Sequence, residues 1–321
     1  MSKIGLSVYG FSLIKLESKK RDIELELHDI EGKLFIDIIK DFVEKNSEKY
    51  TEDRKLEKVF KCDGILEGEV QEGDKGLFNY ICGIVKTGEY GAVSEIVDIE
   101  TGATEYNKKM NDADVLPFYY LIAVPKNHTT KGILILQSSG RNGIKTIFEK
   151  KLQQYMKESS ENIRIAIRTV VPIQYINRYM DHGSLQKIRM IRYGIPHDLS
   201  ERVGINNGVE TTYEERIIHR PVGFMTRKGQ KIRECLNGQR LCNTIIEIDD
   251  FNYDELKLEF KLGKNKKTIS LDNIESLNIN EDITKHVKQE NGHPTQDSII
   301  PILTDTAKSY LVEMGLIIEE R

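Results

Sequence analysis

The sequence predicts an α+β protein with mixed, mostly antiparallel sheets, flanking helices, and two or three subdomains. Three observations lead to this fold class. Many short segments alternate apolar and polar residues and are bounded by glycine, which is typical of half-buried strands. A few longer segments repeat apolar residues at helical spacing. The length of 321 residues also exceeds that of a usual single domain.

The first predicted domain, residues 1–112, is acidic and is expected to contain an antiparallel sheet. "RDIELELHDI" alternates apolar and acidic residues and predicts a half-buried strand. Leu34, Ile38, Ile39 and Phe42 lie at helical spacing and predict an amphipathic helix. From about residue 55 to residue 110, glycines separate short strand-like runs, and "ETG" suits a hairpin turn.

The second predicted domain, residues 113–240, is basic. "LPFYYLIAVP" and "ILILQS" are expected to form a hairpin, followed by a helix with the apolar stripe Ile144, Phe148, Leu152 and Met156. "IRIAIRTVV" and "LQKIRMIRYGIP" predict two strands, and "TRKGQKIRECLNGQR" predicts a basic helix. The third domain, residues 241–321, combines the hairpin "YDELKLEFKLGKNKKTISL" with a C-terminal helix.

The net charge of −4 conceals an uneven distribution along the chain. Residues 1–120 hold 17 Lys and Arg against 25 Asp and Glu, residues 121–240 hold 21 against 10, and residues 241–321 hold 9 against 16. Two explanations stay open. The acidic parts pack beside the basic middle and neutralise it, or the middle presents an electropositive face to ligands that carry phosphate.

Several classes of protein are disfavoured by composition. No window approaches eighteen uncharged apolar residues, and the N-terminus has no signal-peptide pattern, so we expect a cytoplasmic protein without membrane association. The cysteines Cys62, Cys82, Cys235 and Cys242 form no C-x-x-C pair and lack neighbouring histidines. Reduced thiols, no structural metal and no cofactor are therefore expected.

The stretch "ILILQSSGRNGIKTIF", residues 133–148, resembles a strand–turn–helix junction at which a phosphate binds to the N-terminus of the helix. Its glycines are three apart, and Ile144 separates Gly143 from Lys145, so the spacing of a nucleotide-binding P-loop is absent. Arg141 and Lys145 beside free helix N–H groups would suit one phosphate of a polymer backbone. Alternatively, Ser138, Ser139 and Asn142 cap the helix while the glycines make the turn.

A second candidate site is a set of cations on two predicted strands. Arg164 and Arg168 project from one face of "IRIAIRT", and Lys187 and Arg189 do the same on "LQKIRMIRY". If those strands are neighbours, the four cations share a surface that binds phosphates, supported by Arg178, Arg192 and the tyrosines Tyr175, Tyr179 and Tyr193. Alternatively, they are solvated strand faces paired with carboxylates.

A third candidate is a magnesium-dependent nuclease centre. Such nucleases place an acidic residue and then E-x-K on adjoining strands, so that carboxylates hold Mg²⁺ and the lysine polarises water. Asp249 and Asp250 precede two E-x-K patterns, and Asp250, Glu259 and Lys261 are the catalytic candidates. Repeated E-x-K is also what an exposed alternating hairpin contains.

"LPFYYLIAVP", "GILILQSSGRNGIKT" and "QKIRMIRYGIPHDL" resemble segments of uncharacterised bacterial proteins from phage-defence and mobile-element neighbourhoods. The resemblance implies an antiviral context but no functional residue. We therefore expect an accessory or sensor protein that binds DNA or RNA. The expected contacts are Arg141, Lys145, Arg164, Arg168, Lys187, Arg189 and Arg192. The alternatives are an interaction or oligomerisation module of a defence complex, and a nuclease that requires Mg²⁺.

Overall fold

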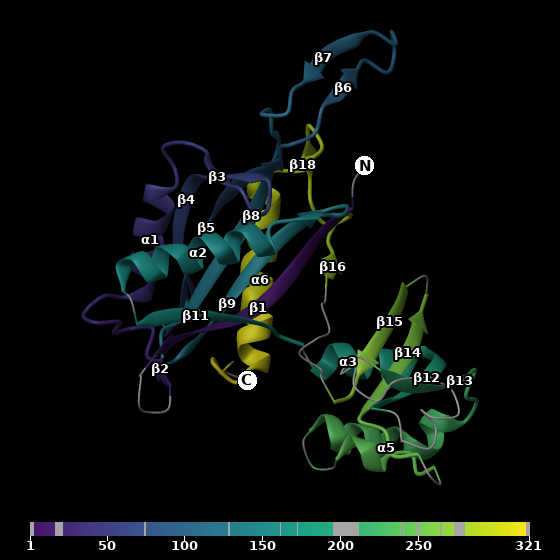
Figure 1. The fold of residues 1–321 in the computed structure, drawn as a ribbon. Helices are drawn as coiled ribbons and strands as arrows, with labels where there is room; N and C mark the ends of the chain where they lie inside the picture. Colours follow the sequence, from purple (N-terminus) through teal and green to yellow (C-terminus); the bar gives the residue numbers. More distant parts are fainter. Residues whose placement is uncertain are drawn as a thin grey trace. The chain divides into compact units, whose positions relative to one another are not determined.

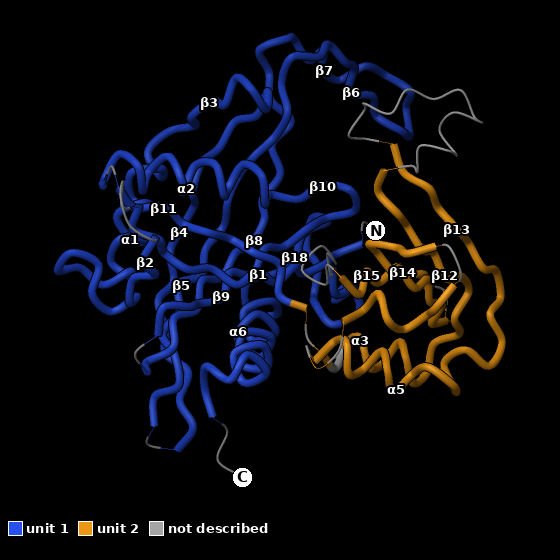
Figure 2. The backbone as a smooth tube through the Cα atoms, turned by 60° about the horizontal axis from the view of Figure 1, so that its bottom comes forward, with its two compact units in different colours: residues 1–170, 279–321 blue, residues 171–278 orange. Residues whose placement is uncertain are grey.

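The fold was analysed in a computed structural model, which describes residues 3–16, 22–73, 75–127, 129–160, 162–171, 173–194, 212–237, 239, 241–248, 251–263, 265–272 and 280–318. The chain divides into two compact units (Figure 2). Unit 1 contains residues 1–170 and 279–321, and unit 2 contains residues 171–278. Helices and antiparallel sheets are present in both units, so the predicted α+β class is confirmed.

Unit 1 is built on a curled ten-stranded sheet with the main order β11-β1-β9-β8-β5-β4-β3. β10, β16 and β2 pair onto this path at β9 and β1. Its strands are β1 (Ile4–Lys15), β2 (Ile23–Leu25), β3 (Thr51–Asp53), β4 (Lys58–Glu72), β5 (Lys75–Glu89), β8 (Asp114–Pro125), β9 (Lys131–Ser139), β10 (Asn142–Gly143), β11 (Ile163–Thr169) and β16 (Asn280–Asp282).

Helices pack on both faces of this sheet (Figure 1). α1 (Phe35–Lys45) and α2 (Lys145–Ser159) cover one face, and α6 (Gln296–Glu313) covers the other. β8 serves both cores, because Phe118 and Tyr120 point to the first and Tyr119 and Leu121 to the second. The central strands are therefore apolar on both faces, which explains their continuous hydrophobic runs.

Two small hairpins complete unit 1. β6 (Ser94–Val97) and β7 (Thr104–Lys108) form a separate two-stranded sheet that projects from the main sheet (Figure 1). β17 (Gln289–Glu290) and β18 (His293–Pro294) form another and precede α6. The predicted "ETG" turn lies between β6 and β7, as expected.

Unit 2 contains a four-stranded antiparallel sheet with the order β13-β12-β14-β15. α3 packs on β12 and β14, and α5 contacts α3. Ile188, Met190, Leu256, Leu258 and Phe260 are buried on one face of the sheet, which is the apolar face. The elements are α3 (Ile173–His182), β12 (Ser184–Tyr193), β13 (Tyr213–His219), α5 (Phe224–Leu236), the 3₁₀ turn η1 (Cys242–Thr244), β14 (Glu255–Leu262) and β15 (Asn265–Ser270).

The two units group residues differently from the predicted domains 1–112, 113–240 and 241–321. β5 pairs with β8 across the 112/113 boundary, and β12 pairs with β14 across the 240/241 boundary. The return of the chain at residue 279 joins its C-terminal part to unit 1, where β16 pairs with β1. Changes in charge along the chain therefore do not mark these structural boundaries.

Two local predictions need correction. The predicted strand around Ile23 is the three-residue β2 at the end of β1, and Ile23 is exposed instead of half-buried. Leu34, expected on the apolar stripe of α1, is the exposed N-cap residue, and Phe35 takes its place in the core. In both cases the residue lies at the terminus of its element, where periodicity cannot determine burial.

Candidate nucleic-acid interface

The polar face of the unit 2 sheet carries two of the predicted contacts, and both are in ion pairs. Lys187 Nζ lies 3.4 Å from Glu259 Oε2 on β14, and Arg189 Nε donates to Glu215 Oε1 on β13 at 2.5 Å. On the same face, Lys257 donates to Glu255 and lowers the pKa of that carboxyl. Each of these cations is therefore paired with a neighbouring carboxylate, as expected if the strand faces are solvated surfaces and not a phosphate-binding site.

Arg192 lies on the opposite face of β12 and has a packing role. Its Nη2 donates to Glu214, and its guanidinium carbon is 4.9 Å from the ring centroid of Phe251. Arg216 contacts the same ring at 4.1 Å and also pairs with Glu214. Phe251 is 2% exposed, so the two arginines cover a buried ring.

Arg164 and Arg168 lie on β11, which pairs with β1 in unit 1. β12 pairs with β13 and β14 in unit 2. The condition for a shared four-cation surface, that the two predicted strands are neighbours, is therefore not met. Arg164 Nη2 is 3.4 Å from Asp22 Oδ2, and Arg168 is exposed with no ion-pair partner among the described residues.

The three tyrosines expected to stack on bases are in different environments. Tyr179 is 5% exposed and belongs to the core of unit 2, so it cannot stack on a base without unfolding. Tyr193 is 51% exposed and meets Tyr213 edge to face with ring centroids 6.5 Å apart. The side chain of Tyr175 lies outside the described residues.

The stretch 133–148 contains most of β9, a turn that leads into the short strand β10, and the first residues of α2. Gly140 adopts φ +59°, a left-handed conformation that glycine tolerates, and Asn142 pairs back onto Ser139. The N-cap of α2 is Ile144 and has no side-chain hydrogen bond, so the predicted cap by Ser138, Ser139 or Asn142 is wrong. Ser138 Oγ instead accepts from Asn280 Nδ2 at 2.6 Å.

The two cations of this stretch lie near the turn. Arg141 is exposed, and Lys145 Nζ lies 4.9 Å from the ring centroid of Tyr9. Burial raises the pKa of Tyr9, which keeps its phenol neutral. Neither cation has an ion-pair partner within the part of the chain that the structure describes.

A further set of cations without an ion-pair partner among the described residues lies on the helices of unit 2 and in the turn before α5. Within the described ranges, Arg178 of α3, Arg220 before α5, and Arg227, Lys228 and Lys231 of α5 form no ion pair. We call these five residues the helical basic set. Apart from Arg178, they were not among the predicted contacts. The signal was present in "TRKGQKIRECLNGQR", where Arg227 and Lys231 are four residues apart and share one helix face.

Arg233 is the remaining cation of α5 and attaches this helix to α3. Its Nη1 donates to Asn177 Oδ1 at 2.5 Å and its Nη2 donates to Asp181 Oδ1 at 2.6 Å. The fork geometry of the guanidinium suits two acceptors on one neighbouring helix. Arg233 thereby fixes the position of α5, and the helical basic set remains available to ligands.

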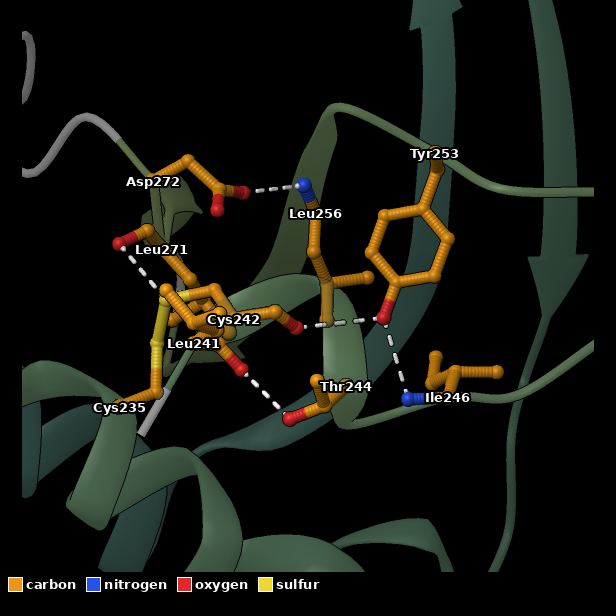
Figure 3. Close-up of a disulfide and its surroundings, with 9 residues drawn as sticks. All are labelled: Cys235, Leu241, Cys242, Thr244, Ile246, Tyr253, Leu256, Leu271 and Asp272. Atoms are coloured by element: carbon orange, nitrogen blue, oxygen red, sulfur yellow. Dashed lines mark hydrogen bonds between the residues drawn. A yellow bond between two sulfur atoms is a disulfide. The ribbon is translucent and has the colours of Figure 1, made fainter. Parts of the chain in front are cut away.

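A disulfide also holds the C-terminal end of α5, in the same last turn as Arg233 (Figure 3). Cys235 of α5 bonds to Cys242 of η1, with their Cα atoms 5.3 Å apart. The hydroxyl of Tyr253 donates to the carbonyl of Cys242 at 3.2 Å and accepts from the N–H of Ile246 at 3.1 Å. The expectation of reduced thiols is thus wrong for this pair, because η1 turns back towards the helix.

The candidate catalytic residues are only partly described. Glu259 is engaged by Lys187, Lys261 is exposed on the same strand, and Asp250 lies outside the described residues. Within the described ranges, no three His, Cys, Asp or Glu side chains gather closely enough to hold a metal ion. The nuclease centre stays a prediction.

None of the helices in the described part of the chain combines the length and apolar character needed to cross a membrane. Neither protein-family models nor curated proteins provide a match for this chain.

Proposed function

We propose that unit 2 binds the phosphate backbone of a nucleic acid through the helical basic set. The observation that supports this proposal is the contrast between its two surfaces. Three sheet cations, Lys187, Arg189 and Lys257, are each paired with a glutamate, whereas Lys261 near the end of β14 forms no ion pair in the described part of the sheet. The cations of the helical basic set have no such partner among the residues described, so their charge is available to an external anion.

Local features of α5 favour an extended anion as the ligand. Arg227 and Lys231 are one helical turn apart, and the first turn of α5 contains no acidic residue. The helix dipole adds positive potential at the same end of α5. Arg227 lies in the first turn of α5, where a cation is unfavourable without a ligand, and a bound phosphate removes that penalty. Three cations on one helix, Arg227, Lys228 and Lys231, suit a polymer better than a single phosphate.

The overall charge predicts moderate affinity. Unit 2 holds 17 Lys and Arg against 15 Asp and Glu, a net charge of +2, and unit 1 holds 30 against 36, a net charge of −6. The excess of 11 positive charges in residues 121–240 is divided between the units. Binding therefore depends on the local arrangement of cations, and we expect it to weaken steeply with salt.

Contacts to phosphate give no direct information about base sequence. We therefore propose binding that is largely independent of sequence, with either DNA or RNA as the ligand. Arg141, Lys145 and Arg168 of unit 1 are retained as additional contact candidates. An accessory or sensor role in prokaryotic antiviral defence is supported by the sequence resemblance alone.

The proposal is tested by fluorescence anisotropy with labelled single-stranded and double-stranded DNA and RNA at low salt. The wild-type chain should bind at least one of these ligands. Arg227→Glu/Lys231→Glu should weaken binding by at least about tenfold, because each reversal replaces attraction by repulsion near the phosphates.

The matched control is Lys49→Glu/Lys157→Glu, which makes the same charge change at two exposed lysines of unit 1. This control should retain most of the wild-type affinity. Equal losses in the two variants would mean that only net charge matters, and they would contradict a site on α5. Absence of binding by the wild-type chain to all four ligands at low salt would reject the proposal.

A further inference from the structure

The sequence of α5 gives this helix little stability of its own. Its 13 residues are close to the length at which an isolated helix is only marginal in water. Gly229 lies in its interior, where glycine is the least favourable residue apart from proline. The N-cap is Gly223, which has no side chain to bond the free N–H groups, and Arg227 opposes the helix dipole. The order of α5 therefore depends on its attachment to the rest of unit 2.

The attachments of α5 are concentrated near its C-terminus. All 13 residues are described, and among them only Ile232 and Cys235 are buried. Arg233, which lies between these two positions, bonds to α3, but its ion pair is partly exposed and contributes little alone. The covalent attachment is the disulfide from Cys235 to Cys242. The cations nearer the N-terminus of α5 therefore keep their positions through contacts made by residues 232–235.

η1 is attached to the sheet independently of the disulfide. It contacts β14, and the carbonyl of Cys242 accepts from the hydroxyl of Tyr253 at 3.2 Å. Cys242 Sγ lies 3.4 Å from the carbonyl oxygen of Leu271 (Figure 3). A disulfide sulfur carries no proton, but the thiol that forms on reduction can donate to this oxygen. Reduction therefore leaves η1 in place and removes the covalent attachment of α5.

A dithiol reductant supplies the chemistry of this step. Cys242 is half-buried and Cys235 is buried, so one thiolate of the reductant attacks Cys242 Sγ, forms a mixed disulfide and displaces Cys235. The second thiolate of the reductant then displaces Cys242. The reductant is oxidised to its own disulfide, and its two protons pass to the two cysteines. Cys62 and Cys82 take no part, because both are buried in unit 1.

We propose that the Cys235–Cys242 disulfide is a redox switch that regulates nucleic-acid binding by α5. In the oxidised chain, the attached helix holds Arg227, Lys228 and Lys231 in a fixed array. In the reduced chain, the helix opens locally and the array loses this spacing. Binding then has to order the helix, and that cost lowers the affinity. The effect on affinity rests on the function proposed above, whereas the effect on helix order requires no ligand.

The first test is fluorescence anisotropy with labelled single-stranded and double-stranded DNA and RNA, with and without dithiothreitol. Reduction should weaken binding by the wild-type chain at least about threefold. Cys235→Ser/Cys242→Ser should bind with the affinity of the reduced wild type under both conditions. Mass spectrometry after alkylation reports the redox state of each sample. Equal affinities of the oxidised and reduced wild-type chain for a nucleic acid that it binds would overturn the proposal.

Hydrogen exchange tests the switch without any ligand. Reduction should speed the exchange of the amides of residues 224–236 at least about tenfold and leave that of β14 unchanged. An oxidised chain that binds none of the four nucleic acids would reject the proposed function, and hydrogen exchange would still decide whether the disulfide controls the order of α5. Exchange in α5 that is the same in both redox states would overturn the switch.

Gly229→Ala tests the link between helix stability and the redox response. A Cβ at this position would meet Met225 Cε at 3.7 Å, an ordinary van der Waals distance, so alanine fits and stabilises the helix. The loss of affinity on reduction should therefore be smaller in Gly229→Ala than in wild type. The control Ser309→Ala, at an exposed position of α6, should keep the full response. A full response in Gly229→Ala would contradict regulation through the order of α5.

Discussion

Arg233 on α5 donates to Asp181 on α3, with Nη2 lying 2.6 Å from Oδ1. The pair is partly exposed, with 34% of the arginine side chain and 49% of the aspartate side chain accessible. The ion pair distinguishes Arg233 from other cations of the same helix. Arg233 contributes to the structure of the helical layer, whereas Arg227 and Lys231 form no ion pair within the described ranges.

Arg233→Ala should lower the free energy of unfolding of the chain by about 1 kcal/mol, because the hydrogen bonds to Asp181 and Asn177 are lost. Arg227→Ala, at an exposed position of the same helix, should change it by less than about 0.5 kcal/mol. Urea denaturation followed by circular dichroism measures both values. Equal changes in the free energy of unfolding for the two variants would contradict a structural role that belongs to Arg233 and not to Arg227.

Phe251 lies against Arg192 and Arg216, and this packing has a measurable energetic consequence. Phe251→Leu should destabilise the chain by about 1 kcal/mol more than Phe260→Leu, since both remove ring volume but only the first removes cation–π contacts. Thermal unfolding of the two variants provides the comparison. A smaller loss for Phe251→Leu would contradict a stabilising role of the arginines.

The four cysteines should differ in their reactivity towards iodoacetamide. Burial raises the pKa of Cys62 and of Cys82 to about 12, so both thiols should resist alkylation in the folded chain. Unfolding without reductant should expose these two thiols, and unfolding with a dithiol reductant should expose four, as counted by mass spectrometry. Alkylation of Cys235 and Cys242 without reductant would contradict the disulfide.

The disulfide also has an expected effect on stability. It closes a short loop between residues seven apart in the sequence. Because this constraint restricts the unfolded chain, Cys235→Ser/Cys242→Ser should lower the free energy of unfolding by about 2 kcal/mol under non-reducing conditions. The same variant compared with wild type in a dithiol reductant should show a much smaller difference.

Asp53 should make the stability of unit 1 depend on pH. Burial tends to raise the pKa of this carboxyl, but Lys150 Nζ at 2.6 Å and the N–H groups of Leu56 and Lys55 lower it below the ordinary value. A pKa that is lower in the folded chain stabilises the fold above the unfolded pKa, which is about 4. That stability is lost as the pH falls through the folded pKa.

Asp53→Asn should therefore be less stable than wild type by about 1–2 kcal/mol at pH 7. The difference should persist down to about pH 4 and shrink at lower pH. Asp22→Asn, at an exposed ion pair, should show little difference across the same range. Denaturant titrations at several pH values measure these differences, and a pH-independent gap for Asp53→Asn would contradict the assignment.

Local periodicity predicted the parts of the fold that depend on a single element. The stripe Ile144, Phe148, Leu152 and Met156 is buried as expected, and the predicted hairpins correspond to β8–β9 and β14–β15. Pairings between distant segments leave no such local signal. The hydrogen bond from the N–H of Ile4 to Thr284 joins residues 280 apart, and no short pattern identifies its partner.

The candidate site was harder to predict for a related reason. Strand alternation correctly placed Lys187 and Arg189 on one face, but the sequence of β12 alone does not reveal that Glu259 and Glu215 lie opposite them. Which cation remains uncompensated is decided by the register of neighbouring strands. On α5, by contrast, a helical periodicity applied to the arginines and lysines would have identified Arg227 and Lys231.

The most direct test of the central claim is the slope of the logarithm of the nucleic-acid association constant against the logarithm of salt concentration. If the chain contacts phosphates through Arg227 and Lys231, the magnitude of this slope should fall by about 0.7–0.9 for each contact removed. Arg227→Ala/Lys231→Ala should therefore reduce the slope by about 1.5, and Lys49→Ala/Lys157→Ala should leave it unchanged. Identical slopes for wild type and Arg227→Ala/Lys231→Ala would contradict phosphate binding by α5.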